Sequence, residues 1–212
     1  MARAKLVDNL TKKKADDSML SFTFLNIFDI NINHRDTIAM IDVIWCPPLF
    51  GWIKCNVDGK AAGSLAACGG IFRDWHANHI LSFSAFIGEG SLVVAEFMAT
   101  VMAIEKTKMM KWNKLWIETG CKLVVLAFSN SNLVPWKLKS LWLMCWDYTL
   151  SIDFRITHIY REANFCADFW VNIGFNSKAI TWLSYVHREI TKDYLLDMKG
   201  TPKFWLGPPL ML

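Results

Sequence analysis

The sequence predicts a mixed α/β domain whose elements follow the order βββαβααβα. Three observations lead to this prediction. Short segments in which apolar and polar residues alternate, a pattern typical of strands, lie between turn residues after the first quarter of the chain. A long segment then repeats its apolar residues at helical spacing, and shorter strand-like and helix-like segments follow it. The chain has 212 residues, of which 53% are hydrophobic, so it can bury the core of such a domain.

Composition and charge limit the classes of protein to consider. A hydrophobic content of 53% with only 20% charged residues excludes disorder over most of the chain. No segment supplies the roughly 20 apolar residues that a membrane-spanning helix needs, so no membrane association is expected. The net charge of +4 permits a nucleic-acid partner without requiring one.

Cysteine usage and the N-terminus bear on the compartment. The six cysteines are scattered and contain no CxxC pair, so neither a disulfide scaffold nor a zinc ribbon is expected. The first residues contain no apolar signal region. We therefore expect an intracellular monomer whose cysteines mostly fill the core, and the sequence does not distinguish nucleus from cytoplasm.

The chain divides into three expected regions. Residues 1–44 form an N-terminal extension with no well-defined pattern. The paired prolines Pro47 and Pro48 lie near the start of the expected domain, residues 45–174, because proline cannot continue a helix or a central strand. Residues 175–212 lose periodicity and contain several glycines and prolines, so they are expected to form a C-terminal tail outside the domain.

The first half of the domain is expected to be an antiparallel meander. Residues 52–57 alternate between apolar and polar side chains, which predicts a strand, and Asp58 with Gly59 is expected to end it as a turn. The second and third strands are expected at residues 67–73 and 79–86.

The second half is expected to alternate helices and strands. Residues 92–110 are rich in Ala, Met and Leu with apolar residues at helical spacing, which predicts a long helix. A strand, two helices, a strand and a helix should follow, at residues 115–119, 121–128, 134–149, 152–159 and 164–173. Asn164 is the expected N-cap of the last helix. The apolar faces of these elements predict six core residues: Ile53, Val57, Ile71, Phe97, Val101 and Ile117.

Three acidic residues lie at expected element ends, namely Asp58, Glu96 and Asp168. Each has a purely structural explanation, because Asp is common in turns and acids favour the first turn of a helix. Element ends can also converge at one edge of an open α/β sheet. Clustered carboxylates repel unless they share protons or bind a hard cation such as Mg²⁺, and two such ions can promote phosphodiester hydrolysis. The spacing alone leaves both interpretations open.

Six segments in a fixed order resemble a known family. They are Trp45-Cys-Pro-Pro48, Gly51-Trp-Ile-Lys-Cys-Asn-Val-Asp-Gly59, Gly69-Gly-Ile-Phe-Arg-Asp74, Ala95-Glu-Phe-Met-Ala99, Trp116-Ile-Glu-Thr119 and His158-Ile-Tyr-Arg-Glu-Ala-Asn-Phe-Cys-Ala-Asp168. Together they resemble the type 1 ribonuclease H domain of plant proteins related to non-LTR retrotransposon reverse transcriptases, over about residues 45–174. The resemblance implies a ribonuclease H-like five-stranded mixed sheet flanked by helices.

The family's active site has four carboxylates that bind two Mg²⁺ ions and cleave the RNA strand of an RNA–DNA hybrid. The resemblance implies that Asp58, Glu96 and Asp168 are three of these catalytic, metal-binding residues. The fourth belongs to a Glu-Thr-Asp-Ser motif, and here Gly120 takes the place of its Asp. The expectation is therefore an RNA–DNA hybrid endoribonuclease with impaired activity. The alternative is a catalytically dead domain that binds nucleic acid or is only a structural remnant.

Other candidates have weaker support. Glu118 could replace the missing ligand only across roughly 6.6 Å, the length of two strand residues. His158 is interpreted as a strand residue rather than a proton shuttle, and the His76 and His79 pair as part of a surface turn rather than a metal site. Aromatic and basic residues that could contact nucleic acid, or simply pack or be solvated, are Trp136, Lys137, Lys139, Trp142 and Trp146, of which the last two are interpreted as helix core.

Overall fold

The computed structural model describes residues 39–207. Residues 42–204 form one compact unit, and residues 39–41 and 205–207 belong to a second. Strands β1 (Ala39–Val43) and β8 (Lys203–Gly207) form a two-stranded sheet. Most of the expected N-terminal extension, residues 1–38, lies outside the described residues. No helix in the described part of the chain is both long and apolar enough to cross a membrane.

A six-stranded mixed sheet is the centre of the larger unit. Its strands, in the spatial order β6-β5-β2-β3-β4-β7, are β6 (Asp153–His158), β5 (Lys114–Thr119), β2 (Ile53–Ala62), β3 (Leu65–Arg73), β4 (His79–Glu89) and β7 (Ile180–Leu183). Strands β2, β3, β4 and β7 are antiparallel neighbours, whereas β5 pairs in parallel with β2 and with β6. All five predicted strands are present, and β7 is an addition.

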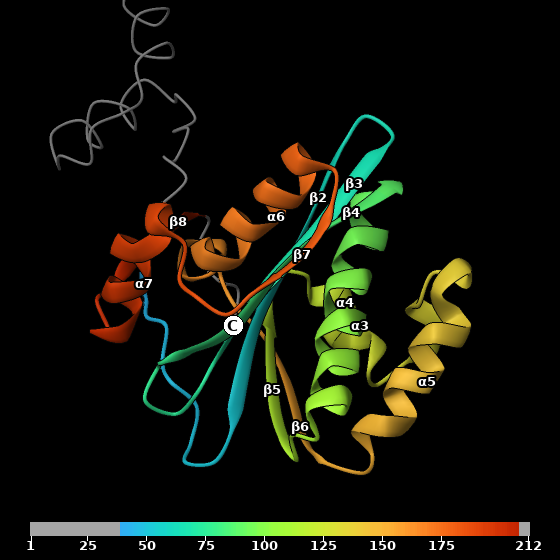
Figure 1. The fold of residues 1–212 in the computed structure, drawn as a ribbon, viewed down its shortest axis with the longest axis horizontal. Coiled ribbons are helices and arrows are strands. Elements are labelled where there is room, and N and C mark those ends of the chain that lie inside the picture. The colour runs from blue at the N-terminus through green and yellow to red at the C-terminus, as the bar shows by residue number, and fades with distance from the viewer. Residues whose placement is uncertain (1–38, 208–212) are drawn as a thin grey trace, which may run out of the picture. The chain divides into compact units, whose positions relative to one another are not determined.

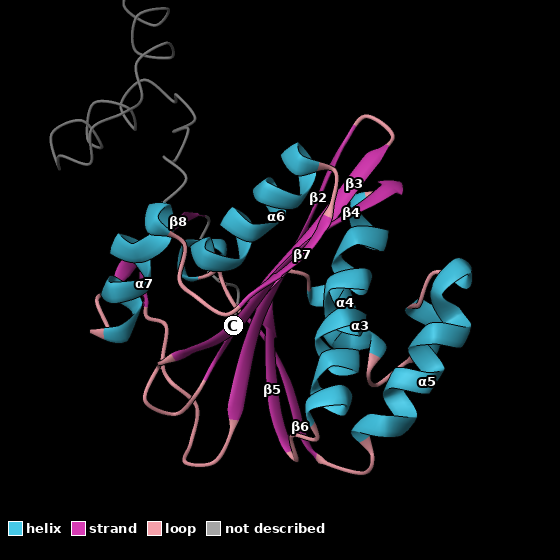
Figure 2. Ribbon diagram, viewed as in Figure 1, coloured by secondary structure: helices cyan, strands magenta, loops and turns pink. Residues whose placement is uncertain are grey.

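Helices cover both faces of this sheet. They are α3 (Leu92–Met110), α4 (Lys122–Ala127), α5 (Lys139–Thr149), α6 (Phe165–Ser177) and α7 (Thr191–Met198), joined by the short 3₁₀ turns η1 (Ser131–Leu133), η2 (Trp136–Leu138), η3 (Arg161–Ala163) and η4 (Arg188–Ile190). Helices α3, α4 and α5 lie on one face, and α6 and α7 lie on the other (Figure 1; Figure 2). From β2 to α6 the element order is the predicted βββαβααβα.

The long helix has the limits that its sequence predicts. Ser91 is its N-cap and accepts a hydrogen bond from the backbone N–H of Val94 at 3.3 Å. At the other end Lys111 adopts the left-handed conformation, with φ 55°, which terminates the helix. Asn164 occupies the N-cap position of α6, as expected, but its side chain makes no capping hydrogen bond.

The expected turn at Asp58 and Gly59 is wrong, because β2 continues through both residues to Ala62. The chain turns instead at Gly63, whose φ is +60°. Gly59 is required for a different reason. A Cβ at this position would lie 2.5 Å from the backbone nitrogen of Glu96, so only glycine lets helix α3 approach β2 this closely.

The predicted core is confirmed. Its six residues, Ile53, Val57, Ile71, Phe97, Val101 and Ile117, have exposed fractions of 9% or less. The cysteines are free, and four of them are buried, at positions 55, 68, 145 and 166. Trp142 is buried, but Trp146 is exposed because α5 buries only a narrow stripe of its surface, so that part of the interpretation is wrong.

The region expected as a tail differs most from the prediction, because residues 175–204 belong to the compact unit. Strand β7 pairs with β4 from Ser82 to Ala85. In α7, Asp197 is fully buried and accepts a hydrogen bond from Arg73 Nη1 at 2.9 Å and from Lys203 Nζ at 2.8 Å. Contacts with residues far away in the sequence hold this segment in place. The four residues of β7 are too few to show a periodic pattern, so the sequence analysis missed the strand.

We predict that Asp197→Ala will lower the free energy of unfolding by about 3–5 kcal/mol, because it leaves the buried Arg73 guanidinium without its carboxylate. Urea unfolding followed by circular dichroism would measure the change. Asp153→Ala is the matched control, since Asp153 forms an exposed ion pair with Lys114 and its loss should cost about 1 kcal/mol or less. Equal losses in the two variants would contradict a structural role for the buried pair.

Candidate active site

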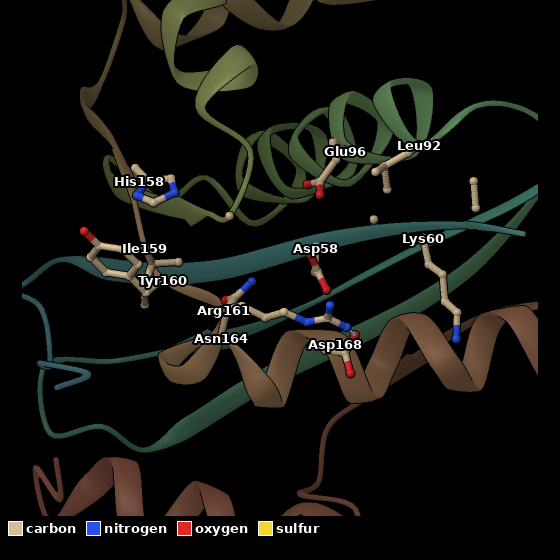
Figure 3. Close-up of a pocket in the computed structure, with 13 residues that line it drawn as sticks. Asp58, Lys60, Leu92, Glu96, His158, Ile159, Tyr160, Arg161, Asn164 and Asp168 are labelled. Carbon is tan, nitrogen blue, oxygen red and sulfur yellow. Dashed lines mark ion pairs between the residues drawn. The ribbon is translucent and has the colours of Figure 1, made fainter. Parts of the chain in front are cut away.

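One pocket brings together all three acidic residues predicted from the sequence. Asp58 in β2, Glu96 in α3 and Asp168 in α6 line it, together with Gly120, which follows β5. Figure 3 shows Asp58 between Glu96 and Asp168. The middle of β2, the first turns of α3 and α6 and the end of β5 therefore meet at one place.

The strand register explains why Gly120 lies beside Asp58. Strands β2 and β5 are parallel, and the last pair in their register joins Val57 to Thr119, so that Asp58 and Gly120 follow side by side. Gly120 has no positive φ, and the nearest atom to a Cβ built on it is the carbonyl oxygen of Ile159, at 4.0 Å. The backbone therefore does not require glycine here, and the pocket has room for a side chain.

The carboxyl groups in the pocket interact electrostatically. Burial raises the pKa of Asp58 to about 7, and the negative charge of Asp168 adds to this effect. Burial also raises the pKa of Glu96 to about 8, with a further contribution from Asp58. Thr119 Oγ1 donates a hydrogen bond to Glu96 Oε2 at 3.3 Å. In the metal-free pocket at neutral pH, part of this carboxylate cluster is protonated.

Asp168 has polar partners of its own. Arg161 Nη2 lies 3.5 Å from Asp168 Oδ1, and Asn172 Nδ2 donates to Asp168 Oδ2 at 3.1 Å. Lys60 Nζ in turn donates to Asn172 Oδ1 at 2.6 Å. Arg161 and Lys60 are both exposed, so they place two positive charges at the edge of the pocket. The sequence analysis missed both, although Lys60 lies two residues after Asp58 and therefore on the same face of β2.

Glu118 does not lie in the pocket. Its Oε1 lies 2.8 Å from Lys54 Nζ, and its Oε2 accepts a hydrogen bond from Asn56 Nδ2 at 3.1 Å. Both carboxylate oxygens are therefore engaged within the protein. The structure argues against the hypothesis that Glu118 replaces the missing ligand at position 120.

His158 and His76 lie where the sequence analysis placed them, whereas His79 lies in strand β4 and not in the turn. His158 ends β6, as expected of a strand residue, and it also lines the pocket. Burial, and then the charge of Lys122, lower the pKa of His158. His76 is exposed in the turn after β3, whereas His79 Nε2 makes a hydrogen bond with Ser82 Oγ at 2.8 Å.

The pocket contains the type of ligand atom that a hard cation prefers, but too few such atoms are grouped together to hold one. Carboxylate oxygens are the ligands that Mg²⁺ prefers in proteins. Across residues 39–207, however, no three His, Cys, Asp or Glu side chains are grouped in a way that could hold a metal ion as they stand. The pocket therefore offers carboxylate oxygens of the right kind, and Gly120 lies beside them without a side-chain donor.

Comparison with known proteins agrees with this geometry. A family model described as reverse transcriptase-like matches residues 56–174, which is more than half of the chain. The chain belongs to this reverse transcriptase-like family. An Arabidopsis thaliana protein provisionally named as a ribonuclease H protein is 31% identical over 136 residues, which cover 62% of this chain and 22% of that protein. The chain thus spans under a quarter of the length of that relative.

Solved structures place the family domain in the ribonuclease H-like fold. LC11-RNase H1, solved in complex with an RNA/DNA hybrid, is 27% identical with a TM-score of 0.54, and the match covers 59% of this chain and 98% of that one. RNase H1 from Halobacterium salinarum has the same coverage and TM-score at 19% identity, which supports the fold alone. The resemblance and the fold class predicted from the sequence are confirmed.

The raised pKa values predict a pH-dependent stability for the metal-free protein. In the folded state Asp58 and Glu96 keep protons that the unfolded chain releases near the ordinary pKa values of these groups, 3.8 and 4.5. The free energy of unfolding should therefore fall as pH rises from about 4 to 8. Asp58→Asn removes one of these groups, so the variant should be more stable than the wild type at pH 8, by about 1 kcal/mol or more.

Urea unfolding in EDTA at several pH values would test this. Asp147→Asn is the control, because Asp147 is exposed on α5, and it should leave the slope unchanged. A wild-type stability that does not change over this pH range would contradict the electrostatic interaction in the pocket.

Proposed function

We propose that this chain binds an RNA–DNA hybrid at the pocket and hydrolyses its RNA strand endonucleolytically, with Mg²⁺ and at a low rate. The observation that carries the proposal is the meeting of Asp58, Glu96 and Asp168 in one pocket, with Gly120 at the position expected for a fourth carboxylate. We also infer that the domain descends from a retrotransposon reverse transcriptase, in line with its family.

Features around the pocket support hybrid binding. LC11-RNase H1, which shares the fold, was solved with an RNA/DNA hybrid. In this chain Arg161 and Lys60 place exposed positive charges beside the acidic residues, where they would face phosphates of a bound strand. Recognition of this kind depends on the backbone and its 2′-hydroxyl groups more than on base sequence.

The three acidic residues and Arg161 have distinct roles in this proposal. A bound Mg²⁺ would polarise the phosphodiester and lower the pKa of a water molecule. Asp58 and Asp168 would hold the cation, with Glu96 as the third carboxylate, and Arg161 would orient the substrate phosphate. Gly120 contributes no side-chain oxygen, so the pocket binds a cation more weakly than one with four carboxylates would.

A second candidate function is binding of nucleic acid without cleavage. Gly120 favours it, because a pocket with one ligand fewer would hold the attacking water less well while Arg161 and Lys60 still contact phosphates. The two functions differ in one measurement, the cleavage of a labelled hybrid in the presence of Mg²⁺.

We predict that the wild-type protein cleaves a labelled RNA–DNA hybrid weakly and that Gly120→Asp raises the Mg²⁺-dependent rate by about tenfold or more, a barrier change of about 1.4 kcal/mol. The variant restores an oxygen donor beside Asp58, and the structure has room for it. Gel analysis of the cleaved RNA strand would measure the rate, with equal folding checked by circular dichroism.

Two further variants make the comparison specific. Gly120→Asn has nearly the same shape without the charge, so it should raise the rate much less. Adding Asp58→Asn to Gly120→Asp should abolish the gain. If Gly120→Asp is folded and gives no increase, the non-catalytic function is favoured. If the wild type cleaves strongly and Glu118→Gln abolishes the cleavage, Glu118 takes part after all.

A further inference from the structure

Asn164 makes an unusual set of contacts for a residue at the start of a helix. Its side chain is 2% exposed and does not cap α6. Its Nδ2 instead donates to the backbone carbonyl of Val57 at 2.9 Å, and its Oδ1 accepts from Asn56 Nδ2 at 3.2 Å. Both ends of the side-chain amide are therefore bonded to β2.

The backbone of Asn164 is bonded to α6 instead of β2. Its carbonyl accepts the N–H of Ala167 at 3.0 Å and that of Asp168 at 3.2 Å. Its side chain thus holds Val57, the residue immediately before Asp58, while its backbone holds Asp168. Asn164 therefore connects the part of β2 that carries Asp58 with the part of α6 that carries Asp168.

The contact with Asn56 is itself fixed. The side-chain amide of Asn56 makes four hydrogen bonds, which is its full capacity. Its oxygen accepts from Trp45 Nε1 and Arg73 Nη2, each at 2.8 Å, and its nitrogen donates to Glu118 and Asn164. Asn56 is fully buried, so the amide cannot rotate without leaving a buried polar group unpaired.

We propose that Asn164 is a positioning residue that sets the separation between Asp58 and Asp168. Two negative charges in a partly buried pocket repel each other, and this repulsion acts to move α6 away from β2. The bonds of Asn164 to Val57 and Asn56 oppose that movement. The proposal rests on the proposed function in one respect, namely that Asp58 and Asp168 bind a cation as a pair.

Mg²⁺ titration by calorimetry, without nucleic acid, would test the effect on the cation site. Asn164→Ala and Asn164→Leu both remove the side-chain bonds, and the second keeps much of the volume. We expect Mg²⁺ affinity to fall about fivefold or more in both variants. Thr149→Val is the control, because it removes a buried hydroxyl that is bonded to Trp146 in α5, away from the pocket, and it should leave the affinity unchanged.

Hydrogen exchange of the metal-free proteins gives a second, independent measurement. In the Asn164 variants the amides of Ala167 and Asp168 should exchange at least about fivefold faster relative to the rest of the domain, and Thr149→Val should not show this local change. If the wild type binds no Mg²⁺, the cation part of the proposed function is wrong. The positioning role of Asn164 is then tested by the exchange data alone. Unchanged Mg²⁺ affinity in the variants, or faster exchange that is uniform over the domain, would overturn the inference.

Discussion

Helices α3 and α6 rest directly on the backbone of the sheet, and the position of the acidic residues depends on this contact. A Cβ at Gly59 would lie 2.5 Å from the nitrogen of Glu96, and one at Gly69 would lie 2.6 Å from the nitrogen of Val171 in α6. The two helices lie on opposite faces of the sheet (Figure 1). Any side chain at either glycine would push a helix outward and carry Glu96 or Asp168 away from Asp58.

Local patterns predicted most of the fold, and contacts between distant segments account for what they missed. Periodicity and the turn residues between segments located the five strands and the long helix. It could not show that β2 continues through Asp58 and Gly59, since an Asp-Gly pair resembles a turn until α3 is packed on it. Strand β7 has only four residues and is defined by its pairing with β4. The site was predicted through its acidic residues, whereas the role of Asn164 depends on bonds across 107 residues of sequence.

The glycine at position 120 has two opposing physical effects. Under the proposed function, it gives the pocket one oxygen ligand fewer than an aspartate at this position would, and therefore a lower affinity for a divalent cation. It also removes a negative charge from a place where Asp58 and Glu96 already have raised pKa values, which relieves repulsion in the metal-free state. The proposed loss of cation affinity would thus be accompanied by a gain in the stability of the metal-free domain, a balance between activity and stability that is common in proteins.

The extra strand at the edge of the sheet has a consequence for solubility. The family match ends at residue 174, before β7. A fragment cut at that point would leave β4 without its partner strand along Ser82–Ala85, with backbone N–H and C=O groups unpaired there. Exposed strand edges of this kind pair with other chains and aggregate. The residues that cover this edge of the sheet therefore lie after the last residue of the family match.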